Sequence, residues 1–400
     1  MRYHGMLLTT TCRTIVAFTC LLSSIFLWAS CGKRPPYPSY DYDIAQAHEI
    51  KPHRYNIPLK GVPPGHNQLS LTLIVSPTGD VVHAYAGGNS ELLKFWPLVQ
   101  AEVRRWKFTP FEENGKAVTA EVKEYIDFVP PERFPKLHVA APPLQPNSKV
   151  TITLVRRGCF GSCPSYTITI GTDGIVFEGQ GYVVASGRHT DRLDEDKVRN
   201  LANRFVAADF YSMDPVYQAD VTDNPAYVLS IAIDGRTKQV VDYVGAWVGM
   251  PAVITELEDD VDTLGRTDRW VSGSEGLVQA LQAEKFSFRT FEAQLMLKEA
   301  AIRGMTATVK EFLEGGVPLE PLPAPKSDKP YYGVSFDTLG WLNAASRHPD
   351  TLQVLINTGA SKNDQADKDL ALGTATRLGI KDAARALIAY GANPNAGRSR

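Results

Sequence analysis

In the first folded region of the chain, hydrophobic positions alternate, then recur with a helical period, then alternate again. In LSLTLIVSP (69–77) every second residue is aliphatic, and SPTGD leads into VVHAYA, which together predict a β-hairpin. Over 97–107 apolar residues recur at helical spacing, and the proline that opens this stretch suits the first turn of a helix. Alternation resumes over 118–128 after an Asn-Gly turn. The pattern predicts a small α+β domain of order β-β-α-β over residues 66–135.

A second region, residues 148–272, contains three hairpin patterns. KVTITLVRR is its first strand, YTITI and IVF flank GTDG, and VLSIAI and KQVVDYV flank DGRT. Asp-Gly pairs favour tight hairpin turns, so we expect an antiparallel sheet. Two helices are predicted, one with Val198, Leu201 and Phe205 as its apolar stripe and one that follows Pro251. The region is predicted to be a second α+β domain.

Three helical segments of similar sequence follow, within residues 276–397. They are LKEAAIRGMTATVKEFLEGGV, WLNAASRHPDTLQVLINTGA and LGTATRLGIKDAARALIAYGAN, and they close on Gly316, Gly359 and Gly391. The insertion PLPAPKSDKPYYG lengthens the first interval, so the underlying period is about 33 residues. A closing glycine suits the left-handed turn that ends a helix. The third region is therefore predicted to be an all-α repeat stack, which makes the whole chain multidomain.

The N-terminus predicts export. Arg2 and Arg13 precede TIVAFTCLLSSIFLWAS (14–30), a mostly apolar run that ends in small residues, which is typical of a signal peptide over residues 1–30. An uncleaved membrane anchor is the alternative, although about 17 residues is short for a span. The segment 31–65 is rich in Pro and Tyr and is predicted to be a tether.

The stretch WASC resembles the lipobox of bacterial lipoproteins. The resemblance implies that Cys31 is acylated and anchors the chain to a membrane, facing the periplasm. Gly32 follows Cys31 in place of the aspartate that retains lipoproteins at the inner membrane, which favours the outer membrane.

Net charge argues against a nucleic-acid function. The formal charge is −2, and it becomes about −4 when a leader with Arg2 and Arg13 is removed. A chain of 400 residues that is 44% hydrophobic has enough apolar material for the cores of several domains.

SPTGDVV, VRRWKFTPFEENGKAV and IDF, all within 66–135, resemble the C-terminal domain of the TonB family. The resemblance implies a protein-binding module that captures transporter segments by adding strands at a sheet edge. A domain that only packs against its neighbours is the alternative, and Trp106 and Phe108 are predicted core residues.

CFGSCPSY (159–166), followed by DG, NPAY and VGAWVGMP, resembles an uncharacterised bacterial domain family. That family has no established activity, so the resemblance implies a fold and a cysteine clip but no reaction.

Cys159 and Cys163 are predicted to form a disulfide, because thiols are oxidised in exported proteins. A metal site would need further ligands, and His189 has no partner at ligand spacing. A redox dithiol is the third possibility, but C-x-x-x-C here leads into a strand. Closing so short a loop constrains the unfolded chain by only about 2 kcal/mol, so we expect the clip to shape a surface loop for contact.

The sequence contains no recognisable catalytic, metal or cofactor residues. His189 and Asp191 stand in a polar stretch and are expected to be exposed, as are Arg156 and Arg157. Neither a nucleophile elbow nor a phosphate-binding glycine loop is found.

The helical segments resemble ankyrin repeats, with Leu297, Trp341 and Leu372 at the leucine position of the absent T-P-L-H tetrapeptide. The resemblance implies a stack that binds proteins on its concave face. Three imperfect repeats could instead cap the preceding domain.

Together these patterns predict a membrane-anchored periplasmic lipoprotein, a non-catalytic module that binds a protein partner in the cell envelope. No nucleic acid, small-molecule substrate or cofactor is expected. The alternatives are an accessory to TonB-dependent transport, a toxin-neutralising ankyrin protein and an unrecognised envelope hydrolase.

Overall fold

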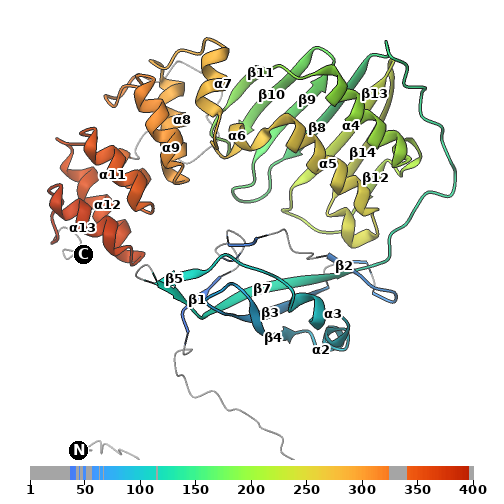
Figure 1. Ribbon diagram of the computed structural model, residues 1–400, viewed down its shortest axis with the longest axis horizontal. Helices are drawn as coiled ribbons and strands as arrows, with labels where there is room; N and C mark the ends of the chain where they lie inside the picture. The colour runs from blue at the N-terminus through green and yellow to red at the C-terminus, as the bar shows by residue number, and fades with distance from the viewer. Residues whose placement is uncertain are drawn as a thin grey trace, which may run out of the picture. The chain divides into compact units, whose positions relative to one another are not determined.

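The protein is multidomain, with sheet-rich N-terminal and central parts and a helical C-terminal region (Figure 1). The computed structural model describes residues 37–41, 45, 48–50, 56–62, 64–65, 67–113, 116–323 and 340–395. The predicted signal peptide (1–30), Cys31 and much of the tether lie outside these residues. Among the described helices, none is both long and apolar enough to cross a bilayer.

The N-terminal sheet has five strands in the order β1-β7-β3-β4, with β2 also paired to β7. Its strands are β1 (Ser39–Tyr40), β2 (Asn56–Pro58), β3 (Gln68–Val75), β4 (Val81–Gly88) and β7 (Ala120–Val129). The aliphatic residues that alternate along β3 are all buried, as the pattern predicts. The short strands β1 and β2, upstream of the predicted domain, run parallel to β7.

Two details of this region differ from the predicted order. The single helix is two, α2 (Ser90–Leu93) and α3 (Trp96–Val103), and α3 ends before Lys107. The backbone after α3 forms bridges instead, between Asp80 and Lys107 and between Glu49 and Phe108. A small hairpin, β5 (Phe111–Glu113) and β6 (Lys116–Val118), then precedes β7. Trp106 and Phe108 are buried, as predicted.

The central sheet has seven strands in the order β11-β10-β9-β8-β13-β14-β12. Its strands are β8 (Val150–Arg157), β9 (Ser165–Gly171), β10 (Gly174–Gly181), β11 (Gly187–Asp191), β12 (Val216–Gln218), β13 (Ala226–Ile233) and β14 (Arg236–Tyr243). The hairpin between β13 and β14 turns at Asp234 and Gly235, which both have positive φ, as a tight I′ turn requires. The sheet is antiparallel except at one edge, where β12 runs parallel to β14, its neighbour in space but not in sequence.

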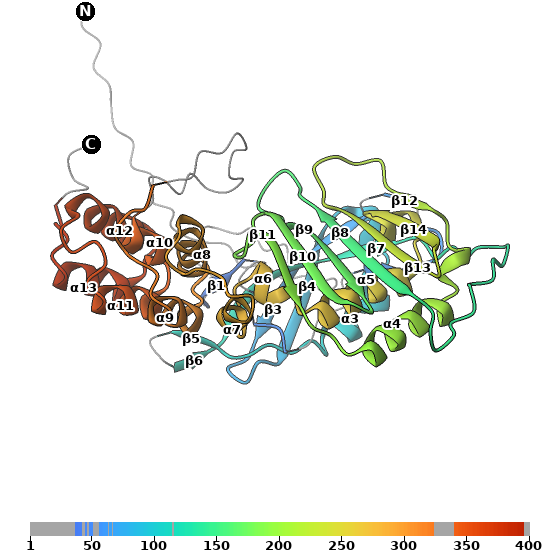
Figure 2. The same cartoon turned by 90° about the horizontal axis from the view of Figure 1, so that it is seen from above.

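Two amphipathic helices cover one face of this sheet (Figures 1 and 2). They are α4 (Glu195–Ala207) and α5 (Ala252–Gly265), and both pack on β8 and β9. The apolar stripe of α4, Val198, Leu201 and Phe205, is buried as predicted. The short helix α6 (Thr267–Val271) follows α5 directly.

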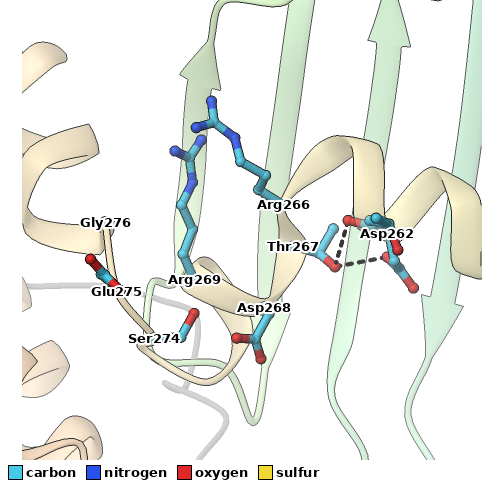
Figure 3. A pocket seen from close by; sticks show the side chains of 9 residues that line it. Asp262, Arg266, Thr267, Asp268, Arg269, Ser274, Glu275 and Gly276 are labelled. Carbon is cyan, nitrogen blue, oxygen red and sulfur yellow. Dashed lines mark hydrogen bonds between the residues drawn. The ribbon is translucent and has the colours of Figure 1, made fainter. Parts of the chain in front are cut away.

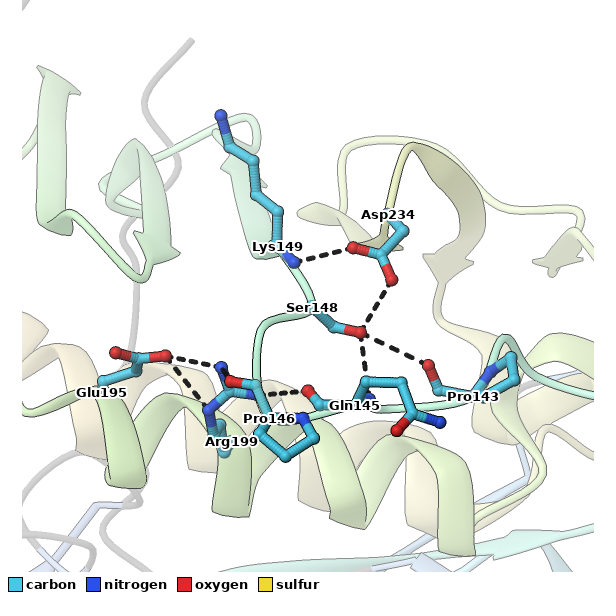
Figure 4. A network of polar contacts seen from close by, with 8 residues as sticks. All are labelled: Pro143, Gln145, Pro146, Ser148, Lys149, Glu195, Arg199 and Asp234. Carbon is cyan, nitrogen blue, oxygen red and sulfur yellow. Dashed lines mark hydrogen bonds and ion pairs between the residues drawn. The ribbon is translucent and has the colours of Figure 1, made fainter.

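A polar network fastens the start of β8 (Figure 4). Asp234, in the β13–β14 turn, accepts hydrogen bonds from the Ser148 hydroxyl at 2.7 Å and from the Lys149 backbone N–H at 2.8 Å. These bonds lower the pKa of Asp234. Arg199 on α4 donates to the carbonyl of Gln145 at 2.7 Å and pairs with Glu195 at 2.5 Å. The segment that leads into the central sheet is thus bound to both a hairpin turn and a helix.

The C-terminal region begins with α7 (Leu277–Ala283) and continues as three helix pairs. The pairs are α8 (Phe291–Ile302) with α9 (Thr306–Glu314), α10 (Trp341–Ala345) with α11 (Pro349–Asn357), and α12 (Gln365–Arg377) with α13 (Lys381–Ala389). Gly316, Gly359 and Gly391 each follow the second helix of a pair and have φ values of 88°, 79° and 99°. The closing glycines therefore take the left-handed conformation that the pattern predicts.

Asp367 on α12 caps the helix α10 of the preceding pair. Its carboxylate accepts the backbone N–H groups of Leu342 at 2.9 Å and Asn343 at 3.0 Å, which are free at the start of a helix. Ser361 also donates to this carboxylate at 2.6 Å. Gly340 passes so close that a Cβ there would lie 2.0 Å from the Asp367 Cγ.

The first helix pair is fastened to the central sheet and its connections. Arg303 at the end of α8 donates to the carbonyl of Tyr182 at 2.8 Å, and Thr308 on α9 donates to the carbonyl of Gly273 at 2.5 Å. Buried apolar residues run without interruption from the central sheet into the helices. These two regions share one hydrophobic core.

Candidate functional site

One transverse row of the central sheet carries polar side chains on the face that α5 covers. Tyr166 on β9 pairs with Arg156 on β8. Arg156 pairs in turn with Tyr227 on β13, which pairs with Asp242 on β14. Residues directly opposite each other on neighbouring strands project from the same face. Strand register therefore aligns four polar residues that are far apart in sequence.

Asp262 on α5 ties this row to the helix. One carboxylate oxygen accepts the Arg156 Nε–H at 2.7 Å, and the other accepts the hydroxyls of Tyr166 at 2.7 Å and Thr267 at 2.9 Å. The Arg156 guanidinium also lies over the Tyr227 ring, 4.4 Å from its centroid. The expectation that Arg156 is exposed is wrong, because the half-buried Asp262 carboxylate and the Tyr227 ring shield its charge from solvent.

Burial and the Asp262 carboxylate determine the protonation states of Arg156 and Tyr166. Burial is the largest single influence on Arg156 and opposes its charged form, but the Asp262 carboxylate and the other acidic groups around it together outweigh burial and raise the Arg156 pKa. Burial, together with the Asp262 charge, raises the pKa of Tyr166, so this hydroxyl keeps its proton and donates. Arg156 and Asp262 are thus a charged pair with further hydrogen bonds on the carboxylate, which is the arrangement that a buried ion pair needs.

A second pair of acids lies beside the first. Glu258 is one turn before Asp262 on α5 and is 1% exposed, and its Oε1 has no hydrogen-bond partner among the described residues. Burial, and after it the Asp242 carboxylate, raises its pKa to about 9. Burial also raises the pKa of Asp242, which accepts the Gly245 backbone N–H at 2.6 Å. Glu258 is therefore protonated at neutral pH.

The polar row fixes the stems of the disulfide loop. Arg156 is near the end of β8 and Tyr166 near the start of β9, and the loop between them is closed by the Cys159–Cys163 disulfide, with Cα atoms 5.5 Å apart. The Phe160 backbone N–H donates to the carbonyl of Asp223 at 3.2 Å. The Phe160 ring is 88% exposed, so a restrained loop holds an aromatic side chain in solvent.

Residues 150–265 match the family model described as Domain of unknown function (DUF6438). No match to a TonB C-terminal or an ankyrin family accompanies it, so those two resemblances remain predictions. No curated protein and no solved structure matches the chain.

Three of the sequence motifs that lie within residues 150–265 meet at the polar row. Tyr166 ends CFGSCPSY, Tyr227 ends NPAY, and Gly245 in VGAWVGMP binds Asp242. Sequence reasoning located these motifs but missed their common contact, and it missed Arg156 and Asp262 as members of the site. The signal that could have linked the first two motifs was that each leads into a strand with a tyrosine at its second position.

A second polar cluster lies at the edge strand β11, and it corrects the expectation that His189 is exposed. His189 is 4% exposed and stacks on Trp270 with ring centroids 4.8 Å apart. Its Nδ1 lies 2.9 Å from a carboxylate oxygen of Glu284, which directly follows α7. Asp191, two residues on, binds both Arg266 and Arg269. The helices α6 and α7 supply partners that the local polar sequence does not reveal.

The two clusters are joined by a surface cavity of about 460 Å³ (Figure 3). Asp262 and Thr267 line one part of it, and Arg266 and Arg269 line another. Within the described residues, no group of three or more His, Cys, Asp or Glu side chains is placed to hold a metal ion. The polar row holds the disulfide loop in place, and α5 with the residues that follow it frames a polar cavity.

Proposed function

We propose that this chain is a membrane-anchored periplasmic lipoprotein that acts as a non-catalytic protein-binding module in the cell envelope, and that the Cys159–Cys163 loop is its contact surface. The observation that carries the proposal is Phe160, an aromatic ring 88% exposed on a loop that is closed by a disulfide and bonded to Asp223. Exposed aromatic anchors on restrained loops are typical of binding surfaces, because little conformational entropy is lost on contact.

The surroundings of the loop support this role. Arg156, Tyr166 and Asp262 fasten both stems to α5, so the loop is positioned by a rigid sheet. A disulfide also suits an oxidising compartment such as the periplasm. The proposed acylation at Cys31 would hold the loop near a membrane.

Crosslinking in cells tests the loop directly. A photo-crosslinking amino acid at position 160 of the full chain should give a discrete adduct with an envelope protein. The same amino acid at Leu137, which is 76% exposed outside the loop, serves as the control. Adducts of equal yield at both positions, or none at 160, would show that the loop is not the contact surface.

The disulfide gives a second test. Cys163→Ser should weaken the crosslink at position 160 more than it lowers the melting temperature, because the loop closure stabilises the fold by only about 2 kcal/mol. In the unreduced exported protein, both thiols should resist alkylation by intact mass. A large loss of melting temperature with an unchanged crosslink would contradict the contact role.

A second candidate is an accessory role in TonB-dependent transport. The strand β4 ends the N-terminal sheet and exposes Val82 and Tyr85 over its eight residues. No strand of the described residues pairs with its outer edge, and an open edge can accept an added strand. Titrating the full chain with transporter peptides tests this candidate, and an absence of binding would remove it.

The ankyrin-like helices have a supporting role in this proposal. The hydrogen bonds of Arg303 and Thr308 favour the capping alternative for the first pair, while the later pairs remain candidates for protein binding. Pull-down with the full chain and with a chain ending near residue 275 distinguishes the capping role from the binding role. An unchanged set of partners would show that the helices only cap the central domain.

A further inference from the structure

The cavity at the junction of α5 and α6 has side chains of both charges on its walls. It has a volume of about 460 Å³ and lies in the surface between residues 262 and 276 (Figure 3). Cavities of 300–1,000 Å³ are the usual size of small-molecule sites. The Cys159–Cys163 loop does not line this cavity, so an inference about it is independent of the proposed protein-binding role.

The basic wall of the cavity contains a buried hydrogen-bond donor that has no acceptor. Arg269 is 6% exposed, yet its Nε has no hydrogen-bond partner among the described residues. Arg266 lines the same cavity, and both guanidinium groups bind the single carboxylate of Asp191. Two cations on one anion leave a positive charge uncompensated. A buried donor without a partner is costly, and the uncompensated positive charge of the two guanidinium groups favours a ligand anion at this wall.

Its acidic wall is equally unpaired. Asp268 and Glu275 line the cavity, and their carboxylates form no hydrogen bond or ion pair with any described residue. Asp262 is different, because Arg156, Tyr166 and Thr267 already occupy its oxygens. The Ser274 hydroxyl adds a neutral polar group to the wall. The free carboxylates would attract a cationic group and repel a polyanion.

We propose that this cavity binds a small zwitterion, an amino acid or a dipeptide. The ligand carboxylate lies at Arg269 and Arg266, and the ligand ammonium lies at Asp268 and Glu275. Arginine suits this position because its planar N–H groups match a carboxylate. A free phosphate would pair only with the arginines of the basic wall, and an apolar ligand would pair with neither wall.

Calorimetric titration of the intact protein with the dipeptide alanyl-alanine tests the proposal. We expect saturable binding, and at least about tenfold weaker binding for the N-acetylated dipeptide and for the dipeptide amide, because each lacks one charged partner. Equal binding of either blocked dipeptide would overturn the proposal. Equal binding of acetate or inorganic phosphate would show a simple anion site, and no binding of any probe would also overturn it.

Variants at exposed wall residues keep the test independent of folding. Arg266→Gln and Glu275→Gln should each weaken dipeptide binding by about tenfold, because each removes one charged contact. Arg188→Gln is the matched control, since Arg188 is exposed on β11 and does not line this cavity. Unchanged affinity in both wall variants, or an equal loss in the control, would place the ligand elsewhere.

Discussion

At the scale of single residues, the polar row places more acidic side chains around Arg156 than its one positive charge can neutralise. Asp262 forms an ion pair with Arg156, whereas Glu258 is buried beside Asp242 without a cationic partner of its own. The least costly state is a protonated Glu258, because burial of a second anion near the first would be strongly unfavourable.

This proton makes stability depend on pH. The pKa of Glu258 is about 9 in the folded chain and 4.5 ordinarily, so the folded state retains a proton that the unfolded state releases. The contribution of protonated Glu258 to the free energy of unfolding is complete below pH 4.5 and is lost as the pH rises toward 9. Glu258→Gln stays neutral and should stabilise the protein by up to about 3 kcal/mol at pH 7.

Urea unfolding at pH 5, 7 and 9 measures this effect, which should grow with pH. Glu256→Gln is the control, because Glu256 is exposed on the same helix and should change little. If the free energy of unfolding of Glu258→Gln changed with pH as it does in the unmodified chain, a buried proton on Glu258 would be contradicted.

At the scale of elements, the helical pairs are joined by a cap that crosses from one pair to the next. Asp367 on α12 satisfies the first N–H groups of α10, a helix of five residues that has little stability of its own. The approach of Gly340 to Asp367 belongs to this contact.

Gly340→Ala should therefore destabilise the helical region. Its Cβ would lie 2.0 Å from the Asp367 Cγ, and relieving that overlap should cost about 1–3 kcal/mol. Gly373→Ala is the matched control, because Gly373 lies within α12 with open space around it, and alanine there should stabilise the helix by up to about 1 kcal/mol. Thermal unfolding of both variants measures the difference, and equal midpoints would show that the cap is unimportant.

At the scale of the whole molecule, the central sheet and the helical region are not separate bodies. They share a core, and Glu284 joins α7 to His189 on the edge strand. A series of helix pairs attached in this way gains one covered end, which short helical stacks need for stability. Removing the helices would expose the part of the shared core that they cover, so a truncated chain needs a folding control.

Anchoring is the prediction that belongs to the whole chain. Cys31→Ser should abolish incorporation of labelled fatty acid and release the protein from the membrane fraction, because stable attachment depends on acyl chains at this cysteine. Labelled palmitate and cell fractionation measure the two effects. A Cys31→Ser protein that stays membrane-bound without label would favour the uncleaved anchor helix instead.

The sequence by itself determined the local elements, because side-chain period follows directly from backbone geometry. Alternation located β3, β8 and β9, Asp-Gly located the β13–β14 turn, and the closing glycines located the end of each helix pair. The Cys159–Cys163 pairing also followed from short spacing and the predicted compartment.

Only the tertiary structure decided which of these elements meet. Arg156, Tyr227 and Asp262 lie up to about a hundred positions apart, and strand register and the placement of α5 bring them into one network. His189 looked exposed in its polar segment, but Trp270 and Glu284 cover it from helices that the local sequence does not show. Burial and pairing depend on what packs across a residue, so a period within one segment cannot reveal them.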